Sequence, residues 1–220
     1  MKKRVLFLLV VVGIVLIGGI VGRQLWQPSP SELVTQALEG LNGAPSFRYS
    51  VTQHQWVDGK DRILTQIQGE KGGGNTRILG QLVGSEIEMI LIGDSLYNRD
   101  PFTKTWVRFN SSPAAQEVFL AELNPLSSLQ FKELGEIVLS GQQKIDGERV
   151  WVCDFKPSVQ NPIMEEFWSD FSYTLFISKS QKTVVKAIIQ AKNKEKMEPM
   201  SITLQFKDIG KKLSIQTPKL

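Results

Sequence analysis

The chain opens with a long uninterrupted apolar segment, and shorter segments with alternating apolar and polar residues follow it. Val5 to Gly22 contains no charged side chain, and a helix needs about 17–25 mostly apolar residues to cross the hydrocarbon core of a bilayer. Lys2, Lys3 and Arg4 precede this segment, which favours a cytoplasmic N-terminus. The pattern predicts one transmembrane helix over residues 1–22, with the rest of the chain outside the cytoplasm.

The flanks of this segment bear on whether it is removed. A signal peptide has a shorter apolar core and small residues before its cleavage site, whereas Ile20 stands three residues before the most plausible cut, after Gly22. No cysteine is present there for lipidation. We therefore expect an uncleaved signal anchor followed by a linker at residues 23–30. A cleaved signal peptide and a buried core helix remain the alternatives.

Beyond the linker, one helical pattern gives way to strands. Ser31 can cap a helix whose apolar side chains recur at helical spacing: Leu33, Val34, Ala37, Leu38 and Leu41. Residues 46–109 then read as six strands, because β-branched and aromatic residues alternate with polar ones between turn sequences. The first hairpin turn is expected at Asp58 and Gly59.

Two segments interrupt the strand pattern. Ala114 to Leu123 has helix-forming composition, and Pro125 ends it. Val159 to Phe171 is a second predicted helical segment, containing Pro162. A hairpin that turns at Asp146 and Gly147 lies between these two segments, three further strands follow them, and residues 211–220 form a polar tail.

The order of these elements predicts one extracytoplasmic domain over residues 31–210. Hairpins between neighbouring strands indicate an antiparallel sheet of about ten or eleven strands, which must curl to limit its exposed edges and bury one face. A slip of one residue would reverse the face of any strand. Alternation predicts these inward-facing residues: Tyr49, Val51, Ile63, Ile67, Met89, Leu91, Trp106, Trp151, Phe155, Leu175, Ile202 and Leu204.

The residues that could carry catalysis are few. His54 is the only histidine and Cys153 the only cysteine, so neither a Ser-His-Asp arrangement nor a conventional zinc site is indicated. Alternation places Cys153 on an apolar face, which favours a buried thiol. Glu86 and Glu88 resemble a glycosidase pair only superficially, because period-two spacing on one strand is typical of a solvated face. We expect a binding protein, not an enzyme, and no cofactor or metal.

Charge gives no indication of a nucleic-acid partner. The net charge is +4, but Lys2, Lys3 and Arg4 supply three of these charges. The exported part is therefore nearly neutral, and its basic residues are spread among acids rather than gathered into a stripe.

Three stretches resemble the LolA and LolB lipoprotein carriers and their LppX-like relatives. They are IGDSLYNRDPFTKTW, SGQQKIDGERVWVCDFKP and SYTLFISKSQKTVVKAII. The resemblance extends over nearly all of residues 31–210, and it lies in element order and turn placement. It implies a mainly β (α+β) fold: an open, strongly curved antiparallel sheet, or unclosed barrel, with helices on its concave side. It also implies an apolar cavity that binds acyl chains of lipids or lipoproteins.

The two interrupting segments would then act as lids over this cavity. Their side chains expected to pack against an acyl chain are Phe119, Leu123, Met164, Phe167 and Trp168. The linker of about eight residues reaches less than about 30 Å, so an anchored domain would receive or present lipid at its own membrane. The alternative is an anchored envelope sensor or adaptor that uses the same fold to bind a protein partner.

Overall fold

The computed structural model of the chain describes residues 29–109 and 123–220. One eleven-stranded antiparallel sheet dominates it, in the strand order β6-β5-β4-β3-β2-β1-β13-β12-β11-β9-β8. Six strands form the first part of the sheet: β1 (Ser46–Val57), β2 (Lys60–Gly72), β3 (Asn75–Leu82), β4 (Ser85–Ile92), β5 (Ser95–Arg99) and β6 (Trp106–Phe109). Five form the second part: β8 (Ile137–Ile145), β9 (Glu148–Phe155), β11 (Trp168–Ser178), β12 (Val184–Asn193) and β13 (Pro199–Lys207).

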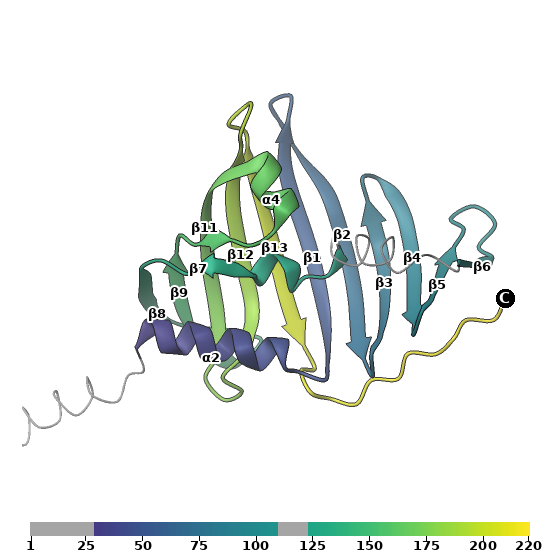
Figure 1. The fold of residues 1–220 in the computed structure, drawn as a ribbon, viewed down its shortest axis with the longest axis horizontal. Coiled ribbons are helices and arrows are strands. Elements are labelled where there is room, and N and C mark those ends of the chain that lie inside the picture. The colour runs from purple at the N-terminus through teal and green to yellow at the C-terminus, as the bar shows by residue number, and fades with distance from the viewer. Residues whose placement is uncertain (1–28, 110–122) are drawn as a thin grey trace, which may run out of the picture.

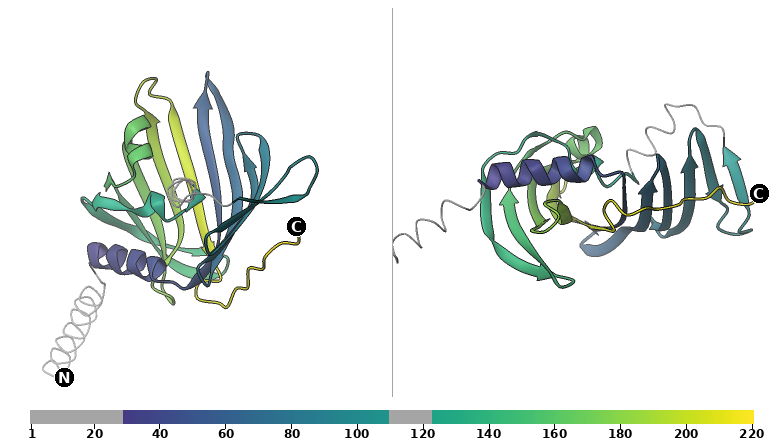
Figure 2. Two further views of the ribbon diagram at one scale, coloured as in Figure 1. Left: turned by 45° about the vertical axis from the view of Figure 1, so that its right-hand side comes forward. Right: turned by 90° about the horizontal axis from the view of Figure 1, so that it is seen from below.

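The remaining described elements are short. They are the helices α2 (Pro30–Asn42) and α4 (Pro162–Phe167), the 3-10 helix η1 (Ser127–Leu129), and a two-stranded sheet of β7 (Phe131–Glu133) and β10 (Ser158–Val159). Strands β6 and β8 are the two edges of the large sheet, so the sheet is open. Figure 1 shows α2, β7 and α4 in front of the β8 to β13 part of the sheet, and Figure 2 shows that part curling around α2. The predicted mainly β fold with an unclosed antiparallel sheet is confirmed.

Helix α2 covers the concave face over β8, β11 and β12. Its N-cap is Ser29, whose Oγ accepts a hydrogen bond from the Glu32 N–H at 3.2 Å, and not Ser31 as the sequence pattern suggested. Pro30 occupies the first turn, where its missing N–H costs nothing. The predicted apolar face is buried as expected, with Val34 and Ala37 fully enclosed.

The hairpin turns at Asp58–Gly59 and Asp146–Gly147 lie where the sequence predicted them. Both residues of each pair have positive φ, with values of 53° and 72° at the first turn and 49° and 84° at the second. A two-residue turn of this kind matches the right-handed twist of the flanking strands, and Asp and Gly tolerate the left-handed backbone that it needs. The strand order of the first part of the sheet follows from such hairpins.

A bulge between β1 and β2 corrects one predicted orientation. Gln53 pairs with Thr65, but the next residue of β1, His54, pairs with Ile63, so Leu64 is the extra residue. Such a bulge reverses the alternation beyond it. Ile63 therefore lies on the outer face beside His54, where it is 51% exposed, and not inside the sheet.

The second predicted helical segment is shorter than expected. Helix α4 begins after Asn161, whose Oδ1 accepts from the N–H groups of Ile163 and Met164 at 3.1 and 3.0 Å. It ends at Phe167, since Trp168 already has the extended backbone of β11. The first predicted helical segment lies outside the described residues except for Leu123.

The predicted membrane helix over residues 1–22 also lies outside the described part. Within residues 29–109 and 123–220, no helix combines the length and the apolar character needed to cross a bilayer. The tail after β13 runs along the ends of β1 to β5 (Figure 1). Its first residues are attached to β1, because the Gly210 N–H donates to the Ser46 carbonyl at 2.8 Å and the Ser46 hydroxyl donates to the Lys211 carbonyl at 2.5 Å.

Candidate functional site

The concave face of the sheet differs between its two parts. Under α2 the face is filled: Leu175, Ile177 and Ile189 are completely buried in one continuous apolar cluster with Leu41 of the helix. These side chains fill the space beneath α2 in the part of the chain that the structure describes. A pocket lies over β1 to β4.

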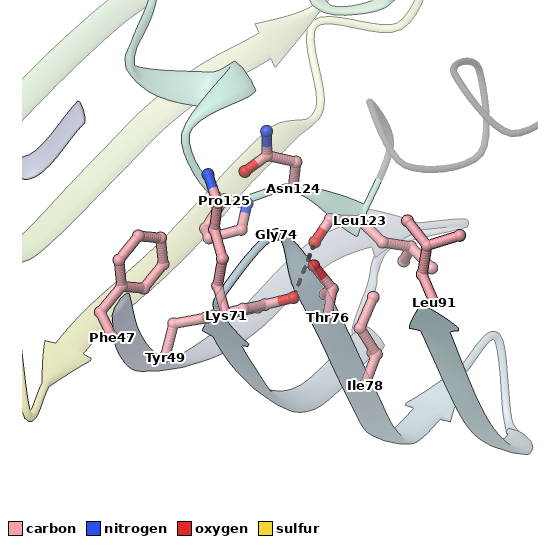
Figure 3. Close-up of a pocket in the computed structure, with 10 residues that line it drawn as sticks. All are labelled: Phe47, Tyr49, Lys71, Gly74, Thr76, Ile78, Leu91, Leu123, Asn124 and Pro125. Atoms are coloured by element: carbon pink, nitrogen blue, oxygen red, sulfur yellow. Dashed lines mark hydrogen bonds between the residues drawn. The ribbon is translucent and has the colours of Figure 1, made fainter. Parts of the chain in front are cut away.

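A pocket of about 220 Å³ lies on the concave side of β1 to β4 (Figure 3). Its apolar lining comes from the three strands β1, β3 and β4 and from a covering segment: Phe47, Tyr49, Ile78, Leu91, Leu123 and Pro125. Strand alternation explains the inner wall, because residues two apart on one strand share a face. The covering segment begins at Leu123 and continues through η1.

Tyr49 links the floor of this pocket to its cover. Its hydroxyl donates a hydrogen bond to the Leu123 carbonyl at 3.4 Å, as Figure 3 shows. The ring lies across Gly69, the residue paired with it on β2. Burial raises the pKa of the Tyr49 hydroxyl, so this group stays a neutral hydrogen-bond donor at physiological pH.

The covering segment from Leu123 to Leu129 is held by local and long-range hydrogen bonds. Asn124 supports its turn, since its Oδ1 accepts from the Leu126 N–H at 3.1 Å and its carbonyl accepts from the Ser127 hydroxyl at 2.7 Å. The Tyr173 hydroxyl of β11 donates to the Ser128 carbonyl at 2.9 Å. Leu129 is buried. Opening this cover would therefore break few bonds, but it would expose apolar surface.

Three polar side chains also border the pocket, from Lys71, Thr76 and Asn124. The Lys71 ammonium lies 5.7 Å from the centroid of the Phe47 ring, within the range of a cation–π contact. An apolar hollow bordered by one ammonium and two neutral hydrogen-bonding groups suits an amphiphile, with its hydrocarbon inside and an anionic or polar group at the entrance.

The described residues that were predicted to line the cavity, from the strands or from the two lid segments, fall mainly into three groups. Tyr49, Leu91 and Leu123 line the pocket. Trp106 is half-buried on β6, but it lies on the outer face, because it pairs with Arg99, whose side chain forms an ion pair with Glu88 on that face. The largest group belongs to the apolar cluster or packs against it: Val51, Ile67, Met89, Trp151, Phe155, Met164, Trp168, Leu175, Ile202 and Leu204.

Three predicted lining residues point elsewhere, Trp106 on the outer face of β6 among them, and one is not described. Ile63 is on the outer face because of the β1–β2 bulge. Phe167 is 56% exposed, because the single turn of α4 buries Met164 and directs Phe167 to solvent. Phe119 lies outside the described residues.

Sequence analysis missed several lining residues. Phe47 and Ile78 have the right strand parity, so alternation could have found both. Lys71 and Thr76 face each other across the β2–β3 hairpin, and only the pairing of these strands reveals that they border a pocket.

His54 lies beside Asp61 and Ser201 on the outer face of the described sheet. Its Nδ1 is 3.1 Å from a carboxylate oxygen of Asp61, and it pairs with Ser201 across β1 and β13, but none of the hydrogen bonds among the described residues joins His54 to Ser201. Glu88 forms ion pairs with Arg77 and Arg99 at 2.7 and 2.8 Å. No group of three or more His, Cys, Asp or Glu side chains in the described ranges is placed to hold a metal ion. Glu86 and Glu88, which were expected on a solvated strand face, thus form ion pairs with basic side chains.

Cys153 is buried as the sequence predicted. Burial first, and the nearby Asp154 charge second, raise the pKa of its thiol to about 11. A thiol of this kind is a poor nucleophile, because the thiolate is the reactive form.

Comparison with solved structures identifies the architecture. The lipoprotein LppX of Mycobacterium tuberculosis aligns with 86% of this chain and 100% of its own, with a TM-score of 0.60 and 14% sequence identity. LprF from Mycobacterium bovis aligns with 87% of this chain and 98% of its own, with a TM-score of 0.59 and 13% identity. The chain has the fold seen in LppX and LprF.

At these identities the likeness establishes the fold alone. A LolA superfamily protein from Nitrosomonas europaea also aligns, over 87% of this chain and 96% of its own at 13% identity, but its TM-score of 0.35 is too low to support a conclusion. No protein-family profile and no curated protein matches the chain. The predicted resemblance is confirmed at the level of the fold, through its LppX-like members.

Proposed function

We propose that this protein is a membrane-anchored extracytoplasmic binding protein that holds acyl chains of lipids or lipoproteins. The observation that supports this proposal most is the apolar pocket over β1 to β4, with Lys71 at its border. The LolA-like fold adds weight, because the resemblance to that family implies acyl-chain binding. The proposal needs no catalytic group.

The chemistry of the lining favours a hydrocarbon ligand. Each methylene removed from water contributes about 0.8 kcal/mol, and this contribution needs no directional partner. The present volume of about 220 Å³ is below the roughly 300–1,000 Å³ of most ligand sites. A short segment of an acyl chain fits as the pocket stands, and a longer chain must displace the cover from Leu123 to Leu129.

The anchor determines where such binding would occur. Residues 1–22 are proposed to stay on the protein as its membrane helix, with residues 23–30 as a linker, 31–210 as the binding domain and 211–220 as a tail. The short linker restricts the domain to receiving or presenting lipid at its own membrane. Intact mass spectrometry of the protein purified from membranes tests this arrangement, and a mature chain that begins near Arg23 would contradict it.

A sensor or adaptor that binds an envelope protein is the second candidate. One observation favours it: the concave face beneath α2 is filled by the protein's own side chains, including Leu175 and Ile189. A filled interior leaves recognition to the outer surface. The two candidates differ in whether the pocket over β1 to β4 takes up lipid.

Binding of a fluorescent fatty-acid probe, excited in the visible range, separates these candidates. Leu91 lines the pocket and is only half-buried, so Leu91→Trp should fill the pocket while the domain stays folded. The matched control is Leu79→Trp, because Leu79 lies on the outer face of the neighbouring strand and is 37% exposed. We expect Leu91→Trp to weaken probe binding at least tenfold and Leu79→Trp to leave it unchanged.

Two outcomes would contradict the lipid-binding proposal. The parent protein could fail to bind the probe, which would leave the adaptor as the leading candidate. Alternatively, Leu91→Trp could bind as tightly as the parent while its thermal melt shows a folded domain, which would place any acyl site elsewhere.

A further inference from the structure

The two ends of the large sheet differ in charge over β8, β9, β11 and β12. Residues 142–151 and 176–186, at the end that carries α2 (Figure 1), contain five basic side chains and two acidic ones. Residues 134–138, 154–170 and 192–198, at the opposite end, contain four basic side chains and seven acidic ones. The tail that leaves the α2 end adds Lys211, Lys212 and Lys219 and no acid. This part of the domain is therefore polarised, with its positive end on the side of α2.

Three of the basic side chains stand in one row across three neighbouring strands. Lys144 of β8 pairs with Arg149 of β9, and both side chains are exposed. The β9–β11 pairing of Val150 with Ser178 places Lys179 next to Arg149, and the Lys179 N–H donates to the Arg149 carbonyl at 3.1 Å. We call Lys144, Arg149 and Lys179 the basic row. Like charges directly opposite each other on neighbouring strands cost stability, so the fold alone does not explain the basic row.

The nearby acids do not neutralise the basic row. Asp146 forms an ion pair with Lys207 at 2.8 Å, and Glu148 accepts hydrogen bonds from two serine hydroxyls. Among the described residues, none of the salt bridges joins the basic row to a carboxylate. The Lys179 ammonium lies 5.0 Å from the centroid of the Trp151 ring instead. The basic row therefore has charge available for an anionic partner.

Helix α2, and with it the start of the described chain, lies at the same end as the basic row. A Cβ atom at Gly40 would meet the Lys182 carbonyl oxygen at 3.4 Å, and α2 also contacts β8. Figure 1 shows the helix across the ends of β8 to β13, with its first turn on the β8 side. The proposed linker of about eight residues reaches less than about 30 Å. A membrane anchor would therefore hold the basic row close to the bilayer.

An anionic lipid surface fits the basic row better than a soluble anion does. A strong site for a single anion needs donors that converge on it, whereas the basic row presents its charges side by side on a sheet. Neighbouring headgroups can meet such a row without convergence, and basic residues close to an anionic lipid surface are attracted to it. Screening limits this attraction to about 8 Å at physiological ionic strength, so it acts on the α2 end of the domain.

We propose that the basic row binds the anionic headgroups of the bilayer in which the protein is anchored, so that the α2 end of the domain faces the membrane. This proposal rests on the membrane anchor of the proposed function, and not on acyl-chain binding. It adds an orientation to that function. Lys71 and Gly74 border the pocket and lie at the same end, at the β2–β3 connection. The Lys71 border of the pocket would then face the bilayer that supplies the acyl chain.

Quenching by spin-labelled lipid headgroups tests this orientation in the full-length protein. The protein is reconstituted into phosphatidylcholine vesicles, with or without phosphatidylglycerol, that contain a lipid with a spin label on its headgroup. A fluorophore is attached at Gln181→Cys, in the exposed β11–β12 connection of the α2 end, or at Met197→Cys at the opposite end. The native Cys153 is fully buried and does not react in the folded protein.

We expect phosphatidylglycerol to increase quenching of the probe at 181 at least twofold and to leave quenching of the probe at 197 unchanged. The increase should disappear at high salt, as screening requires. Unchanged quenching at 181, or an equal increase at both positions, would overturn the proposal and leave the basic row for a soluble anionic partner.

Failure of the anchor is read out separately. Extraction of the vesicles with alkaline carbonate, before any quenching measurement, shows whether the protein spans the bilayer. Release by carbonate would contradict the membrane anchor and, with it, the orientation proposed for the basic row. Retention in the vesicles without a response to phosphatidylglycerol would contradict the basic row alone.

Matched double variants separate the basic row from net charge. Lys144→Gln with Arg149→Gln should remove most of the response to phosphatidylglycerol. Lys156→Gln with Lys194→Gln removes the same charge at the opposite end and should keep the response. Equal loss in both double variants would show that only the net charge matters, which would contradict a specific role for the basic row.

A single variant tests the repulsion within the basic row. Lys144→Glu places a carboxylate opposite Arg149, so repulsion is replaced by attraction. The Tm of the protein in detergent should rise by about 1–3 °C, while the response to phosphatidylglycerol weakens. A Tm at or below that of the parent would contradict the repulsion assigned to the basic row.

Discussion

The ring of Tyr49 lies directly against Gly69 on the neighbouring strand, and a Cβ atom at residue 69 would come within 2.1 Å of Tyr49 Cζ. This approach lets the tyrosine lie flat on the sheet and reach the Leu123 carbonyl. The absence of a side chain at one position of β2 thus shapes the floor of the pocket and supports its cover.

Gly69→Ala should displace Tyr49 and destabilise the domain by about 1–3 kcal/mol, as expected for an inserted methyl group in a packed site. Gly40→Ala in α2 is the control, because its Cβ would meet the Lys182 carbonyl oxygen only at 3.4 Å and alanine favours the helix. Urea unfolding of both variants measures the difference. Gly69→Ala with the stability of the parent would show that Tyr49 can move freely.

Stability should fall at alkaline pH because of Cys153. Burial raises the pKa of its thiol from 9.0 to about 11, so the unfolded chain loses this proton at a lower pH than the folded chain. Stability is then independent of this group below pH 9.0 and decreases as pH rises from 9.0 to about 11. Each unit of pKa difference corresponds to about 1.4 kcal/mol.

Urea unfolding between pH 7 and 11, compared with Cys153→Ala, measures this effect. The variant should be less stable at pH 7 and show a flatter decline above pH 9. Tyr49 and Tyr173, whose pKa values burial also raises, add a decline in both proteins at still higher pH. Parallel curves for the two proteins would show that Cys153 does not contribute.

Acid should loosen the loop that presents Phe102. Hydrogen bonds from the backbone N–H groups of Thr103 and Phe102 lower the pKa of Asp100, so the ionised carboxylate is favoured in the folded loop. This contribution is present above the unfolded pKa and is lost as pH falls through the lowered value. Amide hydrogen exchange at Phe102 and Thr103 should show protection at neutral pH and its loss in acid, after correction for the intrinsic pH dependence of exchange.

Asp100→Ala should remove the same protection at neutral pH, and Asp94→Ala in the β4–β5 turn serves as a control at another site. Unchanged exchange in Asp100→Ala would mean that the loop is ordered by other contacts.

Sequence reasoning predicted the sheet well because its hairpins are encoded locally. Turn pairs such as Asp58–Gly59 and Asp146–Gly147 specify both the position and the geometry of a connection. The filled core was also predicted from a local pattern. Alternation of apolar and polar residues along β9, β11 and β13 correctly placed Phe155, Leu175 and Leu204 inside.

The pocket was harder to predict because it depends on pairing and on single residues. The bulge at Leu64 reversed the face of Ile63, and no local signal marks it. Phe167 was misplaced because only one turn of α4 exists before β11 begins. The role of Gly69 becomes visible only when Tyr49 is placed opposite it.

The central claim is that the pocket over β1 to β4 holds an acyl chain. Photo-crosslinking with a fatty acid that carries a diazirine near its methyl end, followed by peptide mapping, tests this claim most directly. The account predicts crosslinks to Ile78, Leu91 or Leu123, competed by unlabelled fatty acid and greatly reduced in Leu91→Trp. Crosslinks confined to the outer face of the sheet, or none that unlabelled fatty acid displaces, would contradict it.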